Sequence, residues 1–197
     1  MATTMRAASA FPQRPRAHQR AGFTTIELLV AVTVGALLLG LTIPSMSAML
    51  QTQKTVSLVN VFVASLHLAR SEAIKRNGRT VVCKSADGLQ CTTAGGWDQG
   101  WIVFHDTNNN AQYDADEWVA QQQGPAGTGL RLRGNTPVAH YVSYTAHGRA
   151  RLTSGAFQVG TFTLCPTAGA AGANVRKIIL GGPGRPRIDK GVAADCV

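Results

Sequence analysis

One long apolar run dominates the first quarter of the sequence. No charged side chain occurs from Leu28 to Leu50, a stretch longer than the roughly 20 residues that a helix needs to cross a bilayer. Pro44 lies within the run and is expected to kink the helix. The pattern predicts a helix that begins near Phe23 and whose first part, residues 23–50, lies in a membrane.

Beyond residue 50 the apolar positions recur at helical spacing. The apolar stripe consists of Val59, Phe62, Leu66, Ala69 and Ala73. Steps of three and four residues place these side chains on one face of a helix, as expected for a helix packed against a soluble domain. Asn77-Gly78 is a helix-ending signal, so residues 51–78 are predicted to form the amphipathic half of the same helix.

The remainder, residues 79–197, has the composition of strands and turns. Segments rich in β-branched or aromatic residues are Thr80–Lys84, Trp101–His105, Trp118–Gln121, Leu130–Arg133, Ala139–Thr145, Phe157–Leu164 and Arg176–Leu180. Gly and Pro residues separate these segments. The predicted fold class is α+β, with a long N-terminal helix packed on a C-terminal antiparallel β domain arranged as a sandwich or meander.

Charge is concentrated before and at the start of the apolar run. Residues 1–22 carry Arg6, Arg14, Arg16 and Arg20 and no acidic residue. A basic segment of this kind keeps the N-terminus in the cytoplasm, so the rest of the chain is expected across the membrane. Glu27 is the one carboxylate near the start of the run, where an unpaired charge is costly and usually functional.

The segment Gly22-Phe23-Thr24-Thr25-Ile26-Glu27 resembles the processing site of type IV prepilins and type II secretion pseudopilins. In that family a prepilin peptidase cuts after the glycine and methylates the new N-terminal phenylalanine. The resemblance therefore implies cleavage between Gly22 and Phe23 and loss of the leader, residues 1–22. It also implies that residues 23–50 are the transmembrane and assembly helix, in which Glu27 pairs with the new amino group of a neighbouring subunit.

Later segments narrow the resemblance. Four segments resemble the GspH/FimT pseudopilin family: Ala73-Ile74-Lys75-Arg76, Gly100-Trp101-Ile102-Val103-Phe104, Phe162-Thr163-Leu164-Cys165-Pro166 and Gly184-Arg185-Pro186-Arg187. Within that family the sequence is most similar to the FimT-type minor pilins. The family implies a pilin-like fold, with other pilin subunits and prepilin peptidase as partners. It also implies a single-pass protein of the bacterial inner membrane, with a periplasmic C-terminal domain that later reaches the pilus or cell surface.

The net charge is positive and unevenly distributed. The whole chain has 19 Lys and Arg against 10 Asp and Glu, a net charge of +9. From Arg131 to Val197 there are nine basic and two acidic residues, a net charge of +7. A one-sided basic surface indicates a polyanionic partner, and a solvated, solubilising face is the alternative.

The segment Gly184-Arg185-Pro186-Arg187 is the sharpest candidate for a partner site. FimT-type minor pilins that bind DNA carry a Gly-Arg-x-Arg motif near the C-terminus, and this segment matches it. Arg185 and Arg187 are expected to bind phosphates of double-stranded DNA, while Gly184 and its neighbouring glycines let the loop stand clear of the sheet. No aromatic residue is expected beside the motif, so phosphate contacts are expected rather than base reading. Further basic residues that extend this track are Arg149, Arg151, Arg176, Lys177 and Lys190.

The four cysteines all follow the membrane segment and are expected in an oxidising compartment. Four cysteines allow three pairings. We expect Cys83–Cys91, which closes a short hairpin, and Cys165–Cys196, which ties the C-terminus to a strand.

The loop 106–117 resembles a calcium-binding loop. Oxygen ligands at the required alternating spacing are Asp106, Asn108, Asn110, Asp114 and Glu117. Ala111 stands where such loops require glycine, and strands rather than helices flank the loop. We therefore favour an Asx-rich turn closed by its own hydrogen bonds, with no metal.

No catalytic constellation is apparent in the sequence. The histidines, His18, His67, His105, His140 and His147, form no metal-ligand spacing, and no Gly-x-Ser-x-Gly nucleophile elbow is present. We predict that the protein is not an enzyme and uses no cofactor. The predicted function is that of a minor pilin of a type IV pilus that binds extracellular DNA for uptake in competence. The alternative is a type II secretion minor pseudopilin with an assembly role and no DNA binding.

The processing site leads to a first testable prediction. Wild-type protein from membranes is expected to begin at Phe23, whereas Gly22→Leu should accumulate as the full-length precursor because a bulky residue blocks the peptidase. Intact-mass spectrometry of both proteins measures this difference. Wild-type protein that keeps Met1 in the membrane or pilus fraction would contradict the assignment.

Overall fold

The computed structural model describes residues 22–167 and 175–196, and for residues 41–48 only the helical backbone. The chain divides into two compact units, Met1–Ser45 and Met46–Val197. Apart from Gly22, the predicted leader lies outside the described residues, and the kink expected at Pro44 lies where no side chain is described.

The helix α1 spans Thr25–Lys75, 51 residues. At its start the hydroxyl of Thr24 accepts the backbone N–H of Glu27 at 3.3 Å, which satisfies one of the free amide groups of the first turn. At its end Asn77 adopts a left-handed conformation with φ 50°. Gly78 then donates to the carbonyl of Ala73 at 3.1 Å, so the predicted stop signal is the one that ends the helix.

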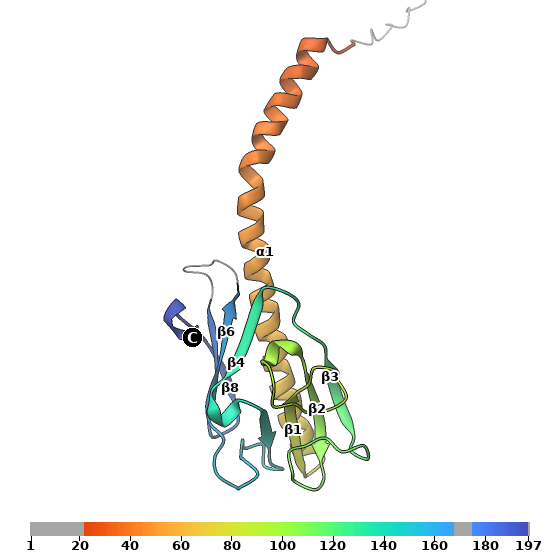
Figure 1. Ribbon diagram of the computed structural model, residues 1–197, viewed down its shortest axis with the longest axis vertical. Helices are drawn as coiled ribbons and strands as arrows, with labels where there is room; N and C mark the ends of the chain where they lie inside the picture. Colours follow the sequence, from red (N-terminus) through yellow and green to blue (C-terminus); the bar gives the residue numbers. More distant parts are fainter. Residues whose placement is uncertain (1–21, 168–174, 197) are drawn as a thin grey trace, which may run out of the picture. The chain divides into compact units, whose positions relative to one another are not determined.

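Two antiparallel four-stranded sheets make up the rest of the second unit (Figure 1). The first sheet has the order β3-β2-β1-β5, with bounds Val119–Gln123, Trp101–Asp106, Arg79–Lys84 and Tyr141–Tyr144. The second sheet has the order β4-β6-β7-β8, with bounds Leu130–Gly134, Gly160–Pro166, Arg176–Leu180 and Pro186–Lys190. Short 3-10 turns lie at Trp97–Gln99, Thr136–Val138 and Ala193–Asp195. The α+β class with antiparallel strands is therefore confirmed.

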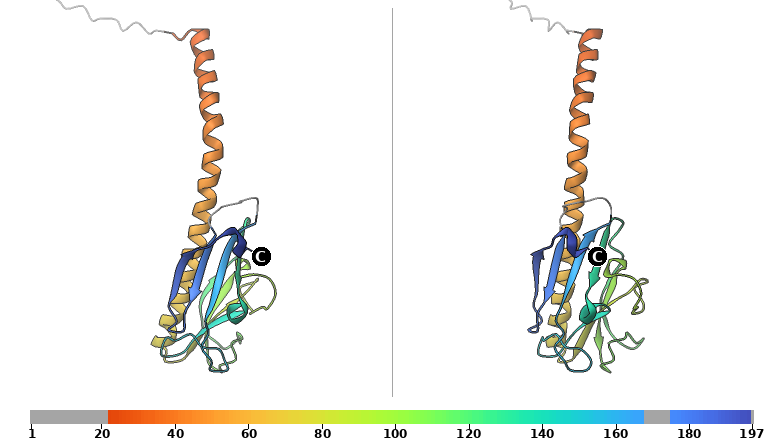
Figure 2. Two further views of the ribbon diagram at one scale, coloured as in Figure 1. Left: turned by 90° about the vertical axis from the view of Figure 1, so that its left-hand side faces the viewer. Right: turned by 60° about the vertical axis from the view of Figure 1, so that its left-hand side comes forward.

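The predicted apolar stripe of α1 forms one wall of the main core. Val59, Phe62, Leu66, Ala69 and Ala73 are all buried. The ring of Phe62 makes edge-to-face contacts with Trp97 at 5.2 Å, Trp101 at 5.0 Å and Phe162 at 4.8 Å between ring centroids. Because Trp101 lies on one sheet and Phe162 on the other, the helix joins both sheets into a single core (Figure 2).

The first sheet is covered on its other face as well. Val81, Cys83, Ile102 and Phe104 point away from α1 and pack with Ala111 in a second apolar cluster. Strand β1 is accordingly buried along most of its length on both faces, as its run of apolar residues requires.

Both expected disulfides are present. Cys83 is joined to Cys91 eight residues later, and Cys165 to Cys196 across a separation of 31 residues. The second bridge links β6 to the C-terminal turn at Ala193–Asp195 and so fixes the end of the chain to the second sheet.

Strands β8 and β6 differ from the sequence prediction. The segment containing Arg187 is a strand, β8, rather than part of a loop, because its backbone pairs with β7 from Arg176↔Lys190 to Leu180↔Pro186. A proline at the first residue of an edge strand is compatible with this pairing. Strand β6 begins at Gly160 rather than at Phe157, which forms only an isolated bridge with Arg151.

The disulfide that closes the longer loop is expected to stabilise the domain more. Cys165→Ala with Cys196→Ala should lower the free energy of unfolding by on the order of 3 kcal/mol, chiefly because the unfolded chain gains freedom. Cys83→Ala with Cys91→Ala removes a shorter loop and should lower it less. Urea unfolding of the three proteins under oxidising conditions tests this order, and the reverse order would contradict it.

Candidate functional site

The two arginines of the Gly-Arg-Pro-Arg segment lie at one end of the second sheet. Residues 181–185 form the turn between β7 and β8, which we call the arginine turn. Arg185 is exposed in this turn, and Arg187 is exposed on β8, where it lies opposite Ile179. Neither guanidinium has a hydrogen bond or ion pair with another described residue, so both are free to bind a ligand.

Gly184 holds the arginine turn against the domain, contrary to the expectation that it lets a loop stand clear. Gly184 is buried and has φ +80°, a conformation that favours glycine. A Cβ atom at this position would clash with the carbonyl oxygen of Gly148 and would lie 3.0 Å from a ring carbon of Tyr144. Close backbone packing therefore places Arg185 relative to the hairpin that contains Gly148.

Helix α1 in turn holds that hairpin. The Nε of Arg70 donates to the carbonyl of Gly148 at 2.9 Å, and a Cβ at Gly148 would lie 2.8 Å from the side chain of Ile74. Tyr144 forms the floor beneath Gly184, and its hydroxyl has no hydrogen-bond partner among the described residues. Burial raises the pKa of Tyr144 well above its usual value, although the charge of Arg70 acts in the opposite direction. The tyrosine is therefore a neutral packing element.

An aromatic side chain lies beside the arginine turn, where none was expected from the sequence. Phe157 is 54% exposed, and a Cβ at Gly182 would lie 3.4 Å from its ring. The guanidinium carbon of Arg151 stands 4.5 Å from the centre of the same ring. The sequence did not indicate this proximity, because Phe157 precedes the turn by more than twenty residues.

The structure does not bring all the predicted basic residues onto one surface. Arg149 is exposed next to Gly148 and hence close to the arginine turn. Arg176 and Lys190 lie opposite each other at the end of β7 and β8, on the side of the sheet that bears Ile178. Lys177 points to the other side and forms an ion pair with Asp195 at 2.6 Å, so its charge is already compensated.

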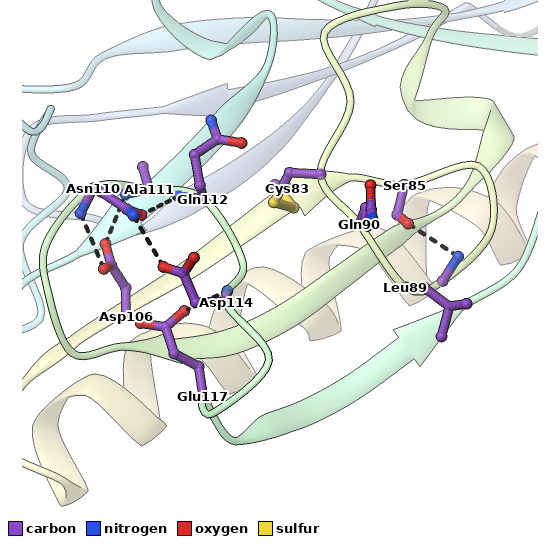
Figure 3. Close-up of a disulfide and its surroundings, with 12 residues drawn as sticks. Cys83, Ser85, Leu89, Gln90, Asp106, Asn110, Ala111, Gln112, Asp114 and Glu117 are labelled. Carbon is purple, nitrogen blue, oxygen red and sulfur yellow. Dashed lines mark hydrogen bonds between the residues drawn. A yellow bond between two sulfur atoms is a disulfide. The ribbon is translucent and has the colours of Figure 1, made fainter.

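The Asp- and Asn-rich loop is closed by its own hydrogen bonds (Figure 3). The carboxylate of Asp106 accepts the N–H groups of Asn110 and Ala111 at 3.1 and 3.0 Å. Glu117 accepts the N–H groups of Thr107 and Asp114, and Asp114 accepts both Asn108 and Asn110 side-chain amides. Ala111 has φ 58°, the left-handed conformation for which calcium loops use glycine. Within the described part of the chain no three His, Cys, Asp or Glu side chains form a metal-binding group.

Apolar side chains of the first unit are exposed. Residues exposed there include Ile26, Leu28, Leu29, Val30, Val32, Leu37, Leu38 and Leu39. Glu27 lies in the first turn of α1 among them. Among the described residues, no helix combines the length and the apolarity that crossing a membrane requires.

Three residues of the candidate site were not predicted from the sequence. Arg70 and Gly148 position the arginine turn, and Phe157 flanks it. Arg70 stands next to Ala69 of the apolar stripe, and Gly148 follows a His in a short turn, which are both weak signals. Only the packing of the two sheets brings these positions together.

Comparison with known proteins assigns the chain to a family. A model of the family described as type II transport protein GspH matches residues 58–184. The chain therefore belongs to the GspH family of type IV pilin-like proteins. A similar protein is the pilin-like protein PilA1 of Thermus thermophilus, which is 29% identical over 182 residues, 86% of this chain and 99% of the relative.

Solved structures with a similar fold include the type IV minor pilin FimU of Pseudomonas aeruginosa. It is 18% identical, with a TM-score of 0.46, and the match covers 76% of this chain and 94% of FimU. The minor pseudopilin EpsH of the type 2 secretion system of Vibrio cholerae is 14% identical, with a TM-score of 0.47, and the match covers 70% of this chain and 97% of EpsH.

The packing of Gly184 leads to a prediction about the arginine turn. Gly184→Ala should destabilise the domain by about 1–3 kcal/mol, because the methyl group meets backbone atoms and φ is unfavourable. Gly182→Ala is a matched control, since the added methyl would make only ordinary contacts at 3.4 Å or more. Thermal unfolding of both variants measures the difference. Equal stability of the two variants would show that the close packing at Gly184 is unimportant.

Proposed function

We propose that this protein is a minor pilin of a type IV pilus, processed by prepilin peptidase and held in the inner membrane by residues 23–50. The exposed apolar side chains of the first unit support this proposal, because a surface of that kind requires lipid or other subunits around it. Two disulfides in the second unit suit a domain that is exported to the periplasm and then to the cell surface.

Glu27 acts in filament assembly in this proposal. Its backbone is held by the cap at Thr24, which leaves its carboxylate at the start of the apolar segment. A carboxylate in that setting is stabilised by a cation, and the amino group of a processed Phe23 in a neighbouring subunit supplies one. The pairing would set the stagger between subunits as they join the filament.

The same protein binds double-stranded DNA through Arg185 and Arg187 and so contributes to DNA uptake. The observation that carries this proposal is the pair of exposed guanidiniums, without partners among the described residues, beside a turn that Gly184 packs against the domain. No acidic residue occurs between Glu117 and Asp189, and Asp189 itself lies on β8 two residues from Arg187. Arginine forks bind phosphates in two-point contacts.

A second candidate function is that of a minor pseudopilin in type II secretion. The description of the matching family as a type II transport protein favours it. In that role the domain would take part in assembly of the pseudopilus, and the arginine turn would contact another subunit rather than DNA.

A titration of labelled duplex DNA decides between these functions. The processed protein, from Phe23 to the C-terminus, should bind the duplex in detergent with a non-specific dissociation constant of roughly 1–100 µM at physiological salt. The affinity should fall steeply as the salt concentration rises. Arg185→Gln with Arg187→Gln should remove most of the binding. Lys54→Gln with Lys75→Gln on α1 is a control with the same loss of charge and should bind as the wild type does. Absence of binding by the wild type at low salt would favour the secretion role, and equal binding by both double variants would exclude the arginine turn as the site.

A further inference from the structure

A second pair of arginines lies at the opposite edge of the second sheet. On β4, Leu130 and Leu132 point into the core, so the intervening Arg131 and Arg133 point out from the other face. Arg131 lies opposite Cys165 and Arg133 opposite Thr163 on β6. Both arginines are exposed, and neither guanidinium has a hydrogen bond or ion pair with another described residue.

These two arginines line a cleft of about 240 Å³, which we call the β4 cleft. The hydroxyl-bearing residues Thr163 and Thr167 line it as well, and the Cys165–Cys196 disulfide forms one of its walls. The cleft thus combines two planar cationic groups with two neutral hydrogen-bond donors. That combination suits a phosphate group, which is anionic and has several acceptor oxygens.

The charge around the β4 cleft stays positive despite one acidic residue. Asp195 also lines the cleft, but its carboxylate is bound to Lys177 at 2.6 Å and accepts the N–H of Val192 at 2.8 Å. The hydrogen bond from Lys177 lowers the pKa of Asp195, so this carboxyl stays ionised and paired. It therefore does not neutralise Arg131 or Arg133.

Lys84, a buried lysine of β1, lies close to Arg133 and adds to the positive field. Lys84 is buried, and its ammonium donates to the carbonyls of Thr93 and Gly95, both at 2.9 Å. Burial lowers the pKa of Lys84, the charge of Arg133 lowers it further, and Asp98 offsets part of the effect. Arg133 and Lys84 therefore repel each other, and an anion bound at Arg133 would relieve that repulsion.

We propose that the β4 cleft binds a phosphate group and that duplex DNA spans the outer face of the second sheet from this cleft to Arg187. This extends the proposed function, on which the DNA part rests. The two edges of the sheet, β4 and β8, are three strand spacings of about 4.8 Å apart, roughly 14 Å. That separation is similar to the width of the major groove of DNA, about 12 Å, so phosphates of the two strands can meet the two edges.

The C-terminal turn lies over part of the face between the two edges, since Cys196 is joined to Cys165 of β6 and Asp195 to Lys177 of β7, so the path of the duplex runs beside this turn. Thr161, Thr163 and Ile179 occupy the centre of the face, where they are half-buried and uncharged. Asp189 is an exposed acid on β8, two residues from Arg187 on the same face, so the phosphate at that edge is expected on the side of Arg187 away from Asp189. If phosphates of the two DNA strands were held at β4 and β8, the uncharged centre of this face would lie beneath the major groove.

The test uses two double variants of the processed protein. The β4 variant carries both Arg131→Gln and Arg133→Gln, and the control carries both Lys54→Gln and Lys75→Gln on α1. With labelled duplex DNA, the β4 variant should bind about tenfold more weakly and lower the slope of log affinity against log salt by about 1, because the cleft holds one phosphate. The control should leave the slope unchanged. Arg131→Lys with Arg133→Lys should keep most of the slope but bind more weakly, because it keeps the charges without the planar forks.

A titration of the wild type with inorganic phosphate tests the cleft without DNA. NMR signals of the arginine Nε–H groups should shift saturably in the wild type, and the shifts that belong to the cleft should be missing in the Gln variant. Phosphate-induced shifts in a protein that binds no DNA would support the cleft and refute the DNA role. The proposal is overturned if the Gln variant matches the control on duplex DNA and phosphate shifts no arginine signal. If single-stranded DNA of equal length depends on both arginine pairs as strongly as duplex does, the spanning of a duplex groove is refuted.

Discussion

The contact of Phe62 with aromatic rings from both sheets is the interaction on which the rest of the domain depends. Its neighbours are Trp97, Trp101 and Phe162, with centroids 4.8 to 5.2 Å away. The inner faces of both sheets and the apolar stripe of α1 form one shared core. Phe62 thus contacts two sheets that share no strand pairing, within a core that also contains Val59, Leu66, Ala69 and Ala73 of α1. The buried indole N–H groups are satisfied as well, since Trp101 donates to Ser65 and Trp97 to the carbonyl of Val138.

The candidate binding surface depends on the same helix through a shorter chain of contacts. Arg70 and Ile74 hold the turn at Gly148, and Gly148 in turn packs against Gly184. Arg70, which is engaged in a hydrogen bond inside the protein, therefore helps to position the exposed Arg185. This division of roles explains why an exposed, basic turn has a defined position: Gly184 packs closely on the domain, and the long side chain of Arg185 reaches solvent.

Much of the positive charge is used inside the protein. Arg70 binds a carbonyl, Arg151 lies over Phe157, Lys177 pairs with Asp195, and Lys84 is buried among carbonyls. Two of these, Arg151 and Lys177, belong to the nine basic residues from Arg131 to Val197, so fewer than nine cations of that region are free to meet a ligand. What remains free on the outer face of the second sheet is concentrated at its two edges. The C-terminal disulfide contributes to this arrangement, because it holds Asp195 where it pairs with Lys177.

The sequence by itself determined the helix and most strands, because these depend on local periodicity and turn residues and need no knowledge of distant neighbours. The four cysteines allowed three pairings, and the structure contains the pairing that was expected. The sequence also indicated Arg185 and Arg187, because they form a contiguous motif. Strand β8 was not predicted, because Gly and Pro around the motif favour a turn and only pairing with β7 makes the segment extended. The neighbours Phe157, Gly148 and Arg131 could be placed only by the tertiary structure, because strand register and sheet packing decide which residues distant in sequence share a surface.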